Sequence, residues 1–163
     1  MARSFLLALV FASVAFGCDA VDVPPGGVPN GTATATLDGQ TYEFRVYAQP
    51  SAYNPAEVVL RAYSDGLSRT LMLTFQPETG AAPVNVEMTG YWDLGLCTPS
   101  AAYVVAQPDD VSIRVTERAG RQLRGTFALR AESTDAPGEV VSFTDGSFAV
   151  RLAEEPFEYC IEG

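Results

Sequence analysis

The chain has 163 residues, a formal net charge of −10 and a sequence pI near 4.3. It contains neither histidine nor lysine, so it cannot form a Ser-His or Cys-His nucleophile pair, a histidine-ligated metal site, a Schiff base or a P-loop. Its acidic surface disfavours nucleic acids and anionic membrane surfaces as partners, which leaves a single-domain protein that lacks the side chains of most enzyme classes.

The first 17 residues have the features of a secretory signal peptide. Arg3 supplies a positive charge, and residues 5–16 form an almost unbroken apolar run that is too short to span a bilayer. Residues 15–18, Ala-Phe-Gly-Cys, resemble the lipobox that lipoprotein signal peptidase recognises, although Ala15 and Phe16 depart from its common residues. This resemblance implies cleavage after residue 17, a lipid on Cys18 and a membrane anchor on the periplasmic or outer face of a bacterial cell envelope. Secretion as a soluble protein is the alternative.

Residues 18–31 are rich in proline and glycine and show no apolar period. We therefore predict a lipid-anchored tether here, followed by one β-domain at residues 32–163. If Cys18 carries the lipid, Cys97 and Cys160 are left as a pair that an oxidising compartment can join in a disulfide. Two thiols that never meet are the alternative.

From residue 32 onward the apolar residues recur with a period of two, which is typical of β-strands, and no stretch has sustained helical spacing. Asp38-Gly39 and Asp65-Gly66 are signals for tight hairpin turns. Residues 77–83 indicate a turn-rich connection, and residues 89–100 a longer loop that holds Cys97. The strands predicted up to residue 117 are 32–37, 40–49, 58–63, 71–75, 84–92, 101–106 and 111–117.

Residues 121–152 predict one long hairpin with its tip at 134–138. In its second half Phe143 and Phe148 both belong on the inner face, yet the step between them is odd. One extra residue restores the parity, so we predict a β-bulge around Asp145 and Gly146, with the glycine in the left-handed conformation. Each glycine of the hairpin then lies opposite a phenylalanine that covers it. The expected cross-strand pairs are Ala131–Val141, Leu129–Phe143, Phe127–Gly146 and Gly125–Phe148.

The motifs GTF at 125–127, FTDGSF at 143–148 and LDGQTYEF at 37–44 resemble those of a group of small bacterial lipoproteins of unknown function. Members of that group share a signal with a lipid-type cysteine, a short tether and one all-β domain. The resemblance implies this layout for most of the mature chain, and it implies no activity.

Carboxylate pairs are the only catalytic groups that the composition leaves. The candidates are Asp109-Asp110, Glu154-Glu155, and Glu132 with Asp135. A glycosidase needs two such groups facing each other across a cleft, and nothing in the spacing indicates that arrangement. We interpret these acids as solvated groups of turns and edges. No calcium-loop pattern occurs either, so we expect no catalytic residue, no metal site and no cofactor.

Three further side chains, Tyr47, Arg61 and Tyr63, fall on the strand face opposite the predicted core. If exposed, they would offer a stacking surface to a glycan or a protein partner. If packed, they belong to the second face of a sandwich or to the outside of a barrel.

Together these patterns predict an all-β protein, a single antiparallel β-sandwich or flattened β-barrel of about eight to ten strands, built mostly from sequential hairpins. We predict a non-enzymatic envelope lipoprotein that acts as a binding or structural module. Its partners would be the membrane, through the lipid on Cys18, and an unknown envelope protein, glycan or small ligand. The first alternative is a calycin-like carrier of a small apolar ligand inside a hollow barrel. The second is a carboxylate-only hydrolase.

Overall fold

The computed structural model of the chain describes residues 28–64, 69–94 and 99–156. Within these ranges the chain is all-β, as predicted, and its strands form one antiparallel ten-stranded sheet. No helix in the described part of the chain is long and apolar enough to cross a membrane. The strands are β1 (Gly31–Leu37), β2 (Gln40–Pro50), β3 (Val58–Ser64), β4 (Arg69–Phe75), β5 (Gly80–Ala81), β6 (Gly90–Leu94), β7 (Pro99–Val104), β8 (Val111–Ala119), β9 (Gln122–Ser133) and β10 (Val140–Arg151), and the 3₁₀ turns are η2 (Val86–Met88) and η3 (Pro108–Asp110).

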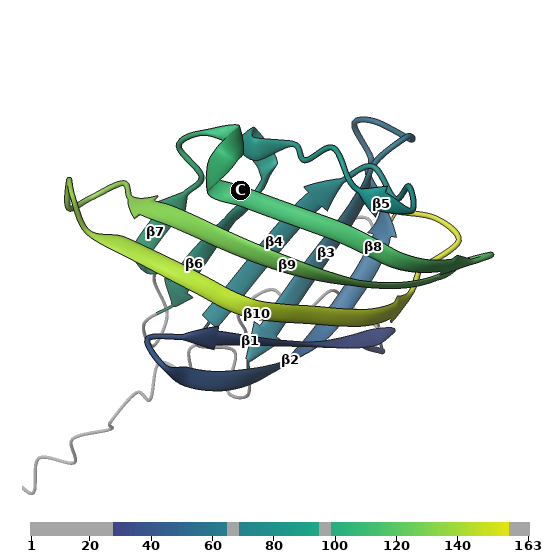
Figure 1. Cartoon of the computed structure of the whole chain (residues 1–163), viewed down its shortest axis with the longest axis horizontal. Coiled ribbons are helices and arrows are strands. Elements are labelled where there is room, and N and C mark those ends of the chain that lie inside the picture. Colours follow the sequence, from purple (N-terminus) through teal and green to yellow (C-terminus); the bar gives the residue numbers. More distant parts are fainter. Residues whose placement is uncertain (1–27, 65–68, 95–98, 157–163) are drawn as a thin grey trace, which may run out of the picture.

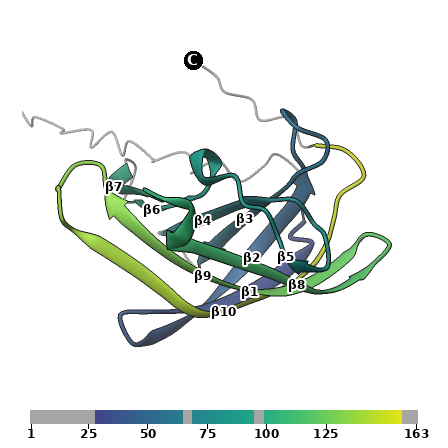
Figure 2. The same ribbon diagram turned by 45° about the horizontal axis from the view of Figure 1, so that its top comes forward.

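The sheet closes on itself into a flattened barrel. Its ring runs β10-β1-β2-β3-β4-β6-β7-β9, and the pairing of β9 with β10 closes it. Strands β7 and β8 pair with the same edge of β9, β7 near Ser133 and β8 along the rest of the strand. The short β5 extends the sheet beyond β8. Figure 1 shows β8, β9, β10 and β1 running across the front while β3, β4 and β6 cross behind them. We call these four strands, with the first half of β2, the front wall; in Figure 2 it lies below the wall of β3, β4 and β6.

The first hairpin has the predicted turn and starts slightly earlier than predicted. Asp38 and Gly39 have φ values of 51° and 78°, so both adopt the left-handed region that a primed two-residue turn requires. The side chain of Asn30 accepts a hydrogen bond from the Ala48 backbone N–H (2.7 Å) and donates one to the Ala48 carbonyl (2.8 Å). The Asn30 side chain thereby continues the hydrogen-bond ladder of β1 by one residue. The barrel therefore includes Asn30 and Gly31, which the composition assigned to the tether.

The barrel interior is filled by apolar side chains that alternate along every long strand. The ring of Tyr91 lies edge-on to that of Phe143 with centroids 5.0 Å apart, and Phe75 and Phe148 are 5.8 Å apart. Such contacts between large rings give a packed core its density. The largest fully buried side chains are Phe44, Phe75, Phe143, Leu60, Leu71 and Leu123.

The long hairpin of β9 and β10 has the predicted register on both sides of its bulge. All four expected pairs occur, and one extra residue lies between Phe143 and Gly146. The predicted source of the left-handed conformation is wrong, however. Asp145 has a φ of 51°, and Gly146 is not among the residues with positive φ. The glycine is required for space instead, because a Cβ at position 146 would lie 2.5 Å from the carbonyl oxygen of Phe127.

The chain between β4 and β7 differs most from prediction. Residues 84–92 do not form one strand: Val84 bridges to Phe75, η2 follows, and β6 begins at Gly90. The cause is a buried polar network. The Thr74 backbone N–H donates to the Thr89 hydroxyl (3.1 Å), and the Thr74 hydroxyl donates to the Met88 carbonyl (2.8 Å). These side-chain bonds replace a strand ladder.

The prediction of a loop at 89–100 is also largely wrong, because β6 extends to Leu94 and β7 starts at Pro99. Other predictions concern residues outside the described ranges. These are the Asp65-Gly66 turn and all three cysteines, Cys18, Cys97 and Cys160. The lipid on Cys18 and the disulfide therefore stay predictions.

Candidate functional site

The predicted acidic residues do not form a catalytic pair. Asp110 lies in η3 and Glu132 near the end of β9, and the guanidinium of Arg130 stands between their carboxylates, at 3.2 Å and 3.3 Å. Glu154 pairs with Arg121 at 2.8 Å. Each of these acids pairs with an arginine, and ion pairs that are this open to solvent contribute at most about 1 kcal/mol of stability.

The other acids of the described region are equally dispersed. Asp135 lies in the exposed hairpin tip, where its backbone N–H donates to the Ser133 hydroxyl. Glu139 accepts a hydrogen bond of 2.6 Å from the buried Tyr103 hydroxyl, which fastens the tip to β7. Among the described residues, no group of three or more acidic, cysteine or histidine side chains is positioned to hold a metal ion.

The aromatic face of β2 and β3 does not present an open stacking surface. Tyr47 and Tyr63 are only 7% and 5% exposed, and their rings meet edge to face with centroids 5.6 Å apart. Arg61 lies half-buried on the same face. This part of the barrel exterior is packed, as the second of the two interpretations expects.

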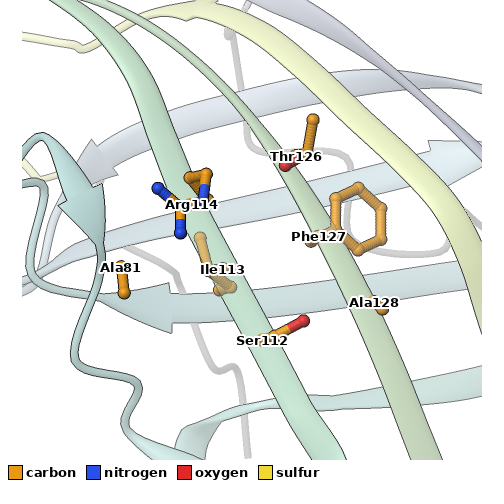
Figure 3. A pocket seen from close by; sticks show the side chains of 7 residues that line it. All are labelled: Ala81, Ser112, Ile113, Arg114, Thr126, Phe127 and Ala128. Carbon is orange, nitrogen blue, oxygen red and sulfur yellow. The ribbon is translucent and has the colours of Figure 1, made fainter.

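The hollow with the clearest chemistry lies on the front wall, where β8 runs between β5 and β9. It is an open hollow of about 370 Å³. Figure 3 shows that one wall comes from β8, the other from β9, and that β5 contributes a single alanine. We call it the Arg114 groove. Its lining residues are Ala81, Ser112, Ile113, Arg114, Thr126, Phe127 and Ala128.

Strand register brings the polar groups of the Arg114 groove together. Arg114 lies directly opposite Thr126 in the β8–β9 ladder, and Ser112 lies two residues away on the same outward face of β8. Directly opposed side chains in an antiparallel pair have Cβ atoms about 5 Å apart, so one ligand group can contact both the guanidinium and a hydroxyl. Ile113 and Phe127 point inward and supply an apolar floor.

Arg114 differs from the arginines that pair with acids on this sheet. Arg121, Arg124 and Arg130 each have a carboxylate within 4 Å. No acidic side chain in the described region pairs with Arg114, which is exposed. A guanidinium that carries five donors and has a hydroxyl beside it suits a carboxylate or another planar oxyanion. The lining holds one cation and two hydroxyls beside an apolar floor.

A second, shallower hollow of about 250 Å³ continues the groove along β8 and β9. It shares Ser112 and Ala128 with the first and reaches Arg130 with its acidic partner Asp110. Two residues of the predicted long hairpin line these hollows. Phe127 forms part of the floor of the first, and Phe143 lines the second. Gly125, Asp145, Gly146 and Phe148 shape the strands and line neither hollow.

Sequence reasoning did not identify Arg114, Ser112 or Thr126. Ser112 and Arg114 follow the outward parity of residues 111–117, which was visible in the alternation. Their placement beside Thr126 depends on the β8–β9 register, which no short motif encodes. No family model, curated protein or solved structure matches the chain, so its fold and this groove carry the functional inference.

Proposed function

We propose that this protein is a non-enzymatic lipoprotein of the bacterial cell envelope, tethered through a lipid on Cys18 and acting as a binding module. The signal-like residues 1–17, the lipobox-like residues 15–18 and the resemblance to small all-β lipoproteins support the anchor. Since the barrel begins at Asn30, residues 19–29 are available as a spacer. Fully extended, such a spacer reaches about 35–40 Å from the membrane.

The observation that carries the binding role is the Arg114 groove, with an exposed arginine that has no acidic partner in the described region, on a chain of net charge −10. Within the described residues this guanidinium has no carboxylate partner, and with the hydroxyls of Ser112 and Thr126 beside it, it can hold one carboxylate in a defined position. We infer that the groove receives a carboxylate from an envelope protein, a glycan or a small ligand.

The two alternative functions have weaker support. A carrier needs a hollow interior, whereas the rings of Phe75, Tyr91, Phe143 and Phe148 pack against one another inside this barrel. A carboxylate-only hydrolase needs two acids that converge on a substrate, whereas Asp110 and Glu132 converge on Arg130. Both observations favour a module that binds on its outer surface.

The anchor is tested by Cys18→Ser in the full-length chain expressed in a Gram-negative host. We expect wild-type protein in the membrane fraction and the variant in the soluble envelope fraction, because one thiol carries the entire lipid attachment. Immunoblotting of the separated fractions measures the ratio. Cys160→Ser is the matched control and is expected to remain with the membranes. A Cys18→Ser chain that still sediments with membranes would contradict the anchor.

A further inference from the structure

We propose that the partner of the Arg114 groove is a second copy of this chain, docked face to face on the front wall so that Glu43 of each copy enters the groove of the other. This inference rests on the proposed function, because it names the partner of the same groove.

The outward side chains of the front wall form rows that cross five strands. One row runs from β8 to β2 as Arg114, Thr126, Ser147, Thr34 and Glu43. The next runs as Glu117, Arg124, Ala149, Thr32 and Arg45. Both rows have opposite charges at their two ends, and the sign of the ends alternates between the rows. The first row has only short side chains between its ends, whereas the second also holds Arg124, which pairs with Glu117 at 3.6 Å.

The end charges of the first row have no partner in the part of their own molecule that the structure describes. Among the described residues, neither Arg114 nor Glu43 takes part in an ion pair or side-chain hydrogen bond, and both are exposed. They lie four strands apart, about 19 Å at ordinary strand spacing, so they cannot reach each other. Two solitary opposite charges at the ends of one row are the arrangement that a two-fold interface requires, since each patch must complement itself.

A two-fold axis parallel to the strands above β10 brings these charges together. It places β8 of one copy over β2 of the other, so Arg114 meets the second copy's Glu43 and Glu117 meets the second copy's Arg45. Ser147 and Ala149 lie on the axis, where each meets its own counterpart. Their side chains are short enough to let the two walls approach closely.

A two-fold axis perpendicular to the strands would also pair opposite charges, Arg114 with Glu117 and Glu43 with Arg45. The tether distinguishes the two axes. Rotation about an axis parallel to the strands preserves strand direction, so β1 begins at the same end of both copies. Rotation about the perpendicular axis places the two starts of β1 at opposite ends of the dimer. Anchoring in a single membrane therefore favours the parallel axis.

The area of the patch indicates a weak dimer that the membrane stabilises. Five strands and the two outward rows cover about 20 Å by 14 Å, so the dimer would bury about 560 Å² in total, below the range of stable complexes. Confinement of both copies to one membrane raises their effective concentration and compensates for a small interface. We therefore expect dimers in membranes rather than in dilute solution.

The test is site-specific photo-crosslinking of the full-length, lipid-anchored chain in its membrane. A residue with a compact diazirine side chain replaces Ser147 on the proposed axis, and the yield of covalent homodimer is measured by immunoblot and mass spectrometry. We expect homodimer from the otherwise wild-type chain. Glu43→Arg and Arg114→Glu should each lower the yield about tenfold, because each creates two like-charge contacts. The double variant, Glu43→Arg with Arg114→Glu, should restore it. Glu87→Arg, the same charge change on the exposed η2, should have no effect.

Each result has a defined meaning. If the double variant restores the yield of homodimer, the lower yield of the single variants comes from like-charge contacts and not from misfolding. A double variant that crosslinks no better than the single variants overturns the proposed axis. Adducts of Ser147 with a different protein, and none with a second copy, overturn this inference and leave the proposed binding function standing. An absence of any adduct, together with a groove that captures nothing, overturns both.

Discussion

Replacing Phe143 by alanine is expected to lower the free energy of unfolding by about 3–5 kcal/mol, the usual cost of deleting a fully buried ring. Phe143 is 1% exposed, and its ring packs edge-on against Tyr91 at 5.0 Å. It also stands at the last regular pair of β9 and β10 before the bulge, opposite Leu129. Urea titration followed by circular dichroism measures the change, as a shift of the midpoint at constant slope.

The matched control is Tyr53→Ala, which also truncates an aromatic side chain. Tyr53 is 85% exposed and lies in the loop between β2 and β3. Surface truncations of this kind change stability by no more than about 0.5 kcal/mol. If Phe143→Ala costs no more than Tyr53→Ala, the packed core of the barrel is not as described.

Adding a methyl group at Gly146 is expected to cost about 1–3 kcal/mol, although alanine is normally the better residue in a sheet. A Cβ there would lie 2.5 Å from the Phe127 carbonyl oxygen and 2.7 Å from two carbons of the Phe127 ring. Because the oxygen belongs to the backbone of β9, the strands must separate to admit the methyl group. Thermal and urea unfolding of Gly146→Ala measure the loss.

The control for Gly146→Ala is Thr126→Ala, one residue from Phe127 on the outward face of β9. It leaves the strand spacing unchanged and should alter stability by no more than about 0.5 kcal/mol. Gly146→Ala with wild-type stability would mean that Phe127 does not cover the glycine and that the register beyond the bulge differs.

The local features of this fold were predictable because their causes are local. Alternation along residues 32–49 with Asp38-Gly39 between the runs determines a hairpin, and the parity conflict between Phe143 and Phe148 determines a bulge. The residue that carries the left-handed conformation was not predictable from a preference for glycine. Asp145 adopts it, as aspartate occasionally does, while Gly146 provides room for Phe127.

The parts that prediction missed depend on contacts between distant segments. A strand at 84–92 fits the alternation, but Thr74, fifteen residues before Thr89, takes the hydrogen bonds that such a strand would need. The candidate site also depends on contacts between distant segments. Arg114 and Thr126 become neighbours through the β8–β9 ladder, and Glu43 joins the same row only after β10 and β1 pair. No spacing within one segment indicates this row.

The most direct test of binding through the Arg114 groove is affinity capture from the native envelope with tagged full-length chain, Cys18 intact. Captured material, whether a second copy or another envelope component, is quantified by mass spectrometry for wild type, Arg114→Gln and Arg151→Gln. Arg151 is an exposed arginine of β10 that does not line the groove. We expect Arg114→Gln to capture about tenfold less partner than wild type and Arg151→Gln to capture the wild-type amount, because only Arg114 supplies the charge in the groove. Equal capture by wild type and Arg114→Gln would contradict binding through this groove.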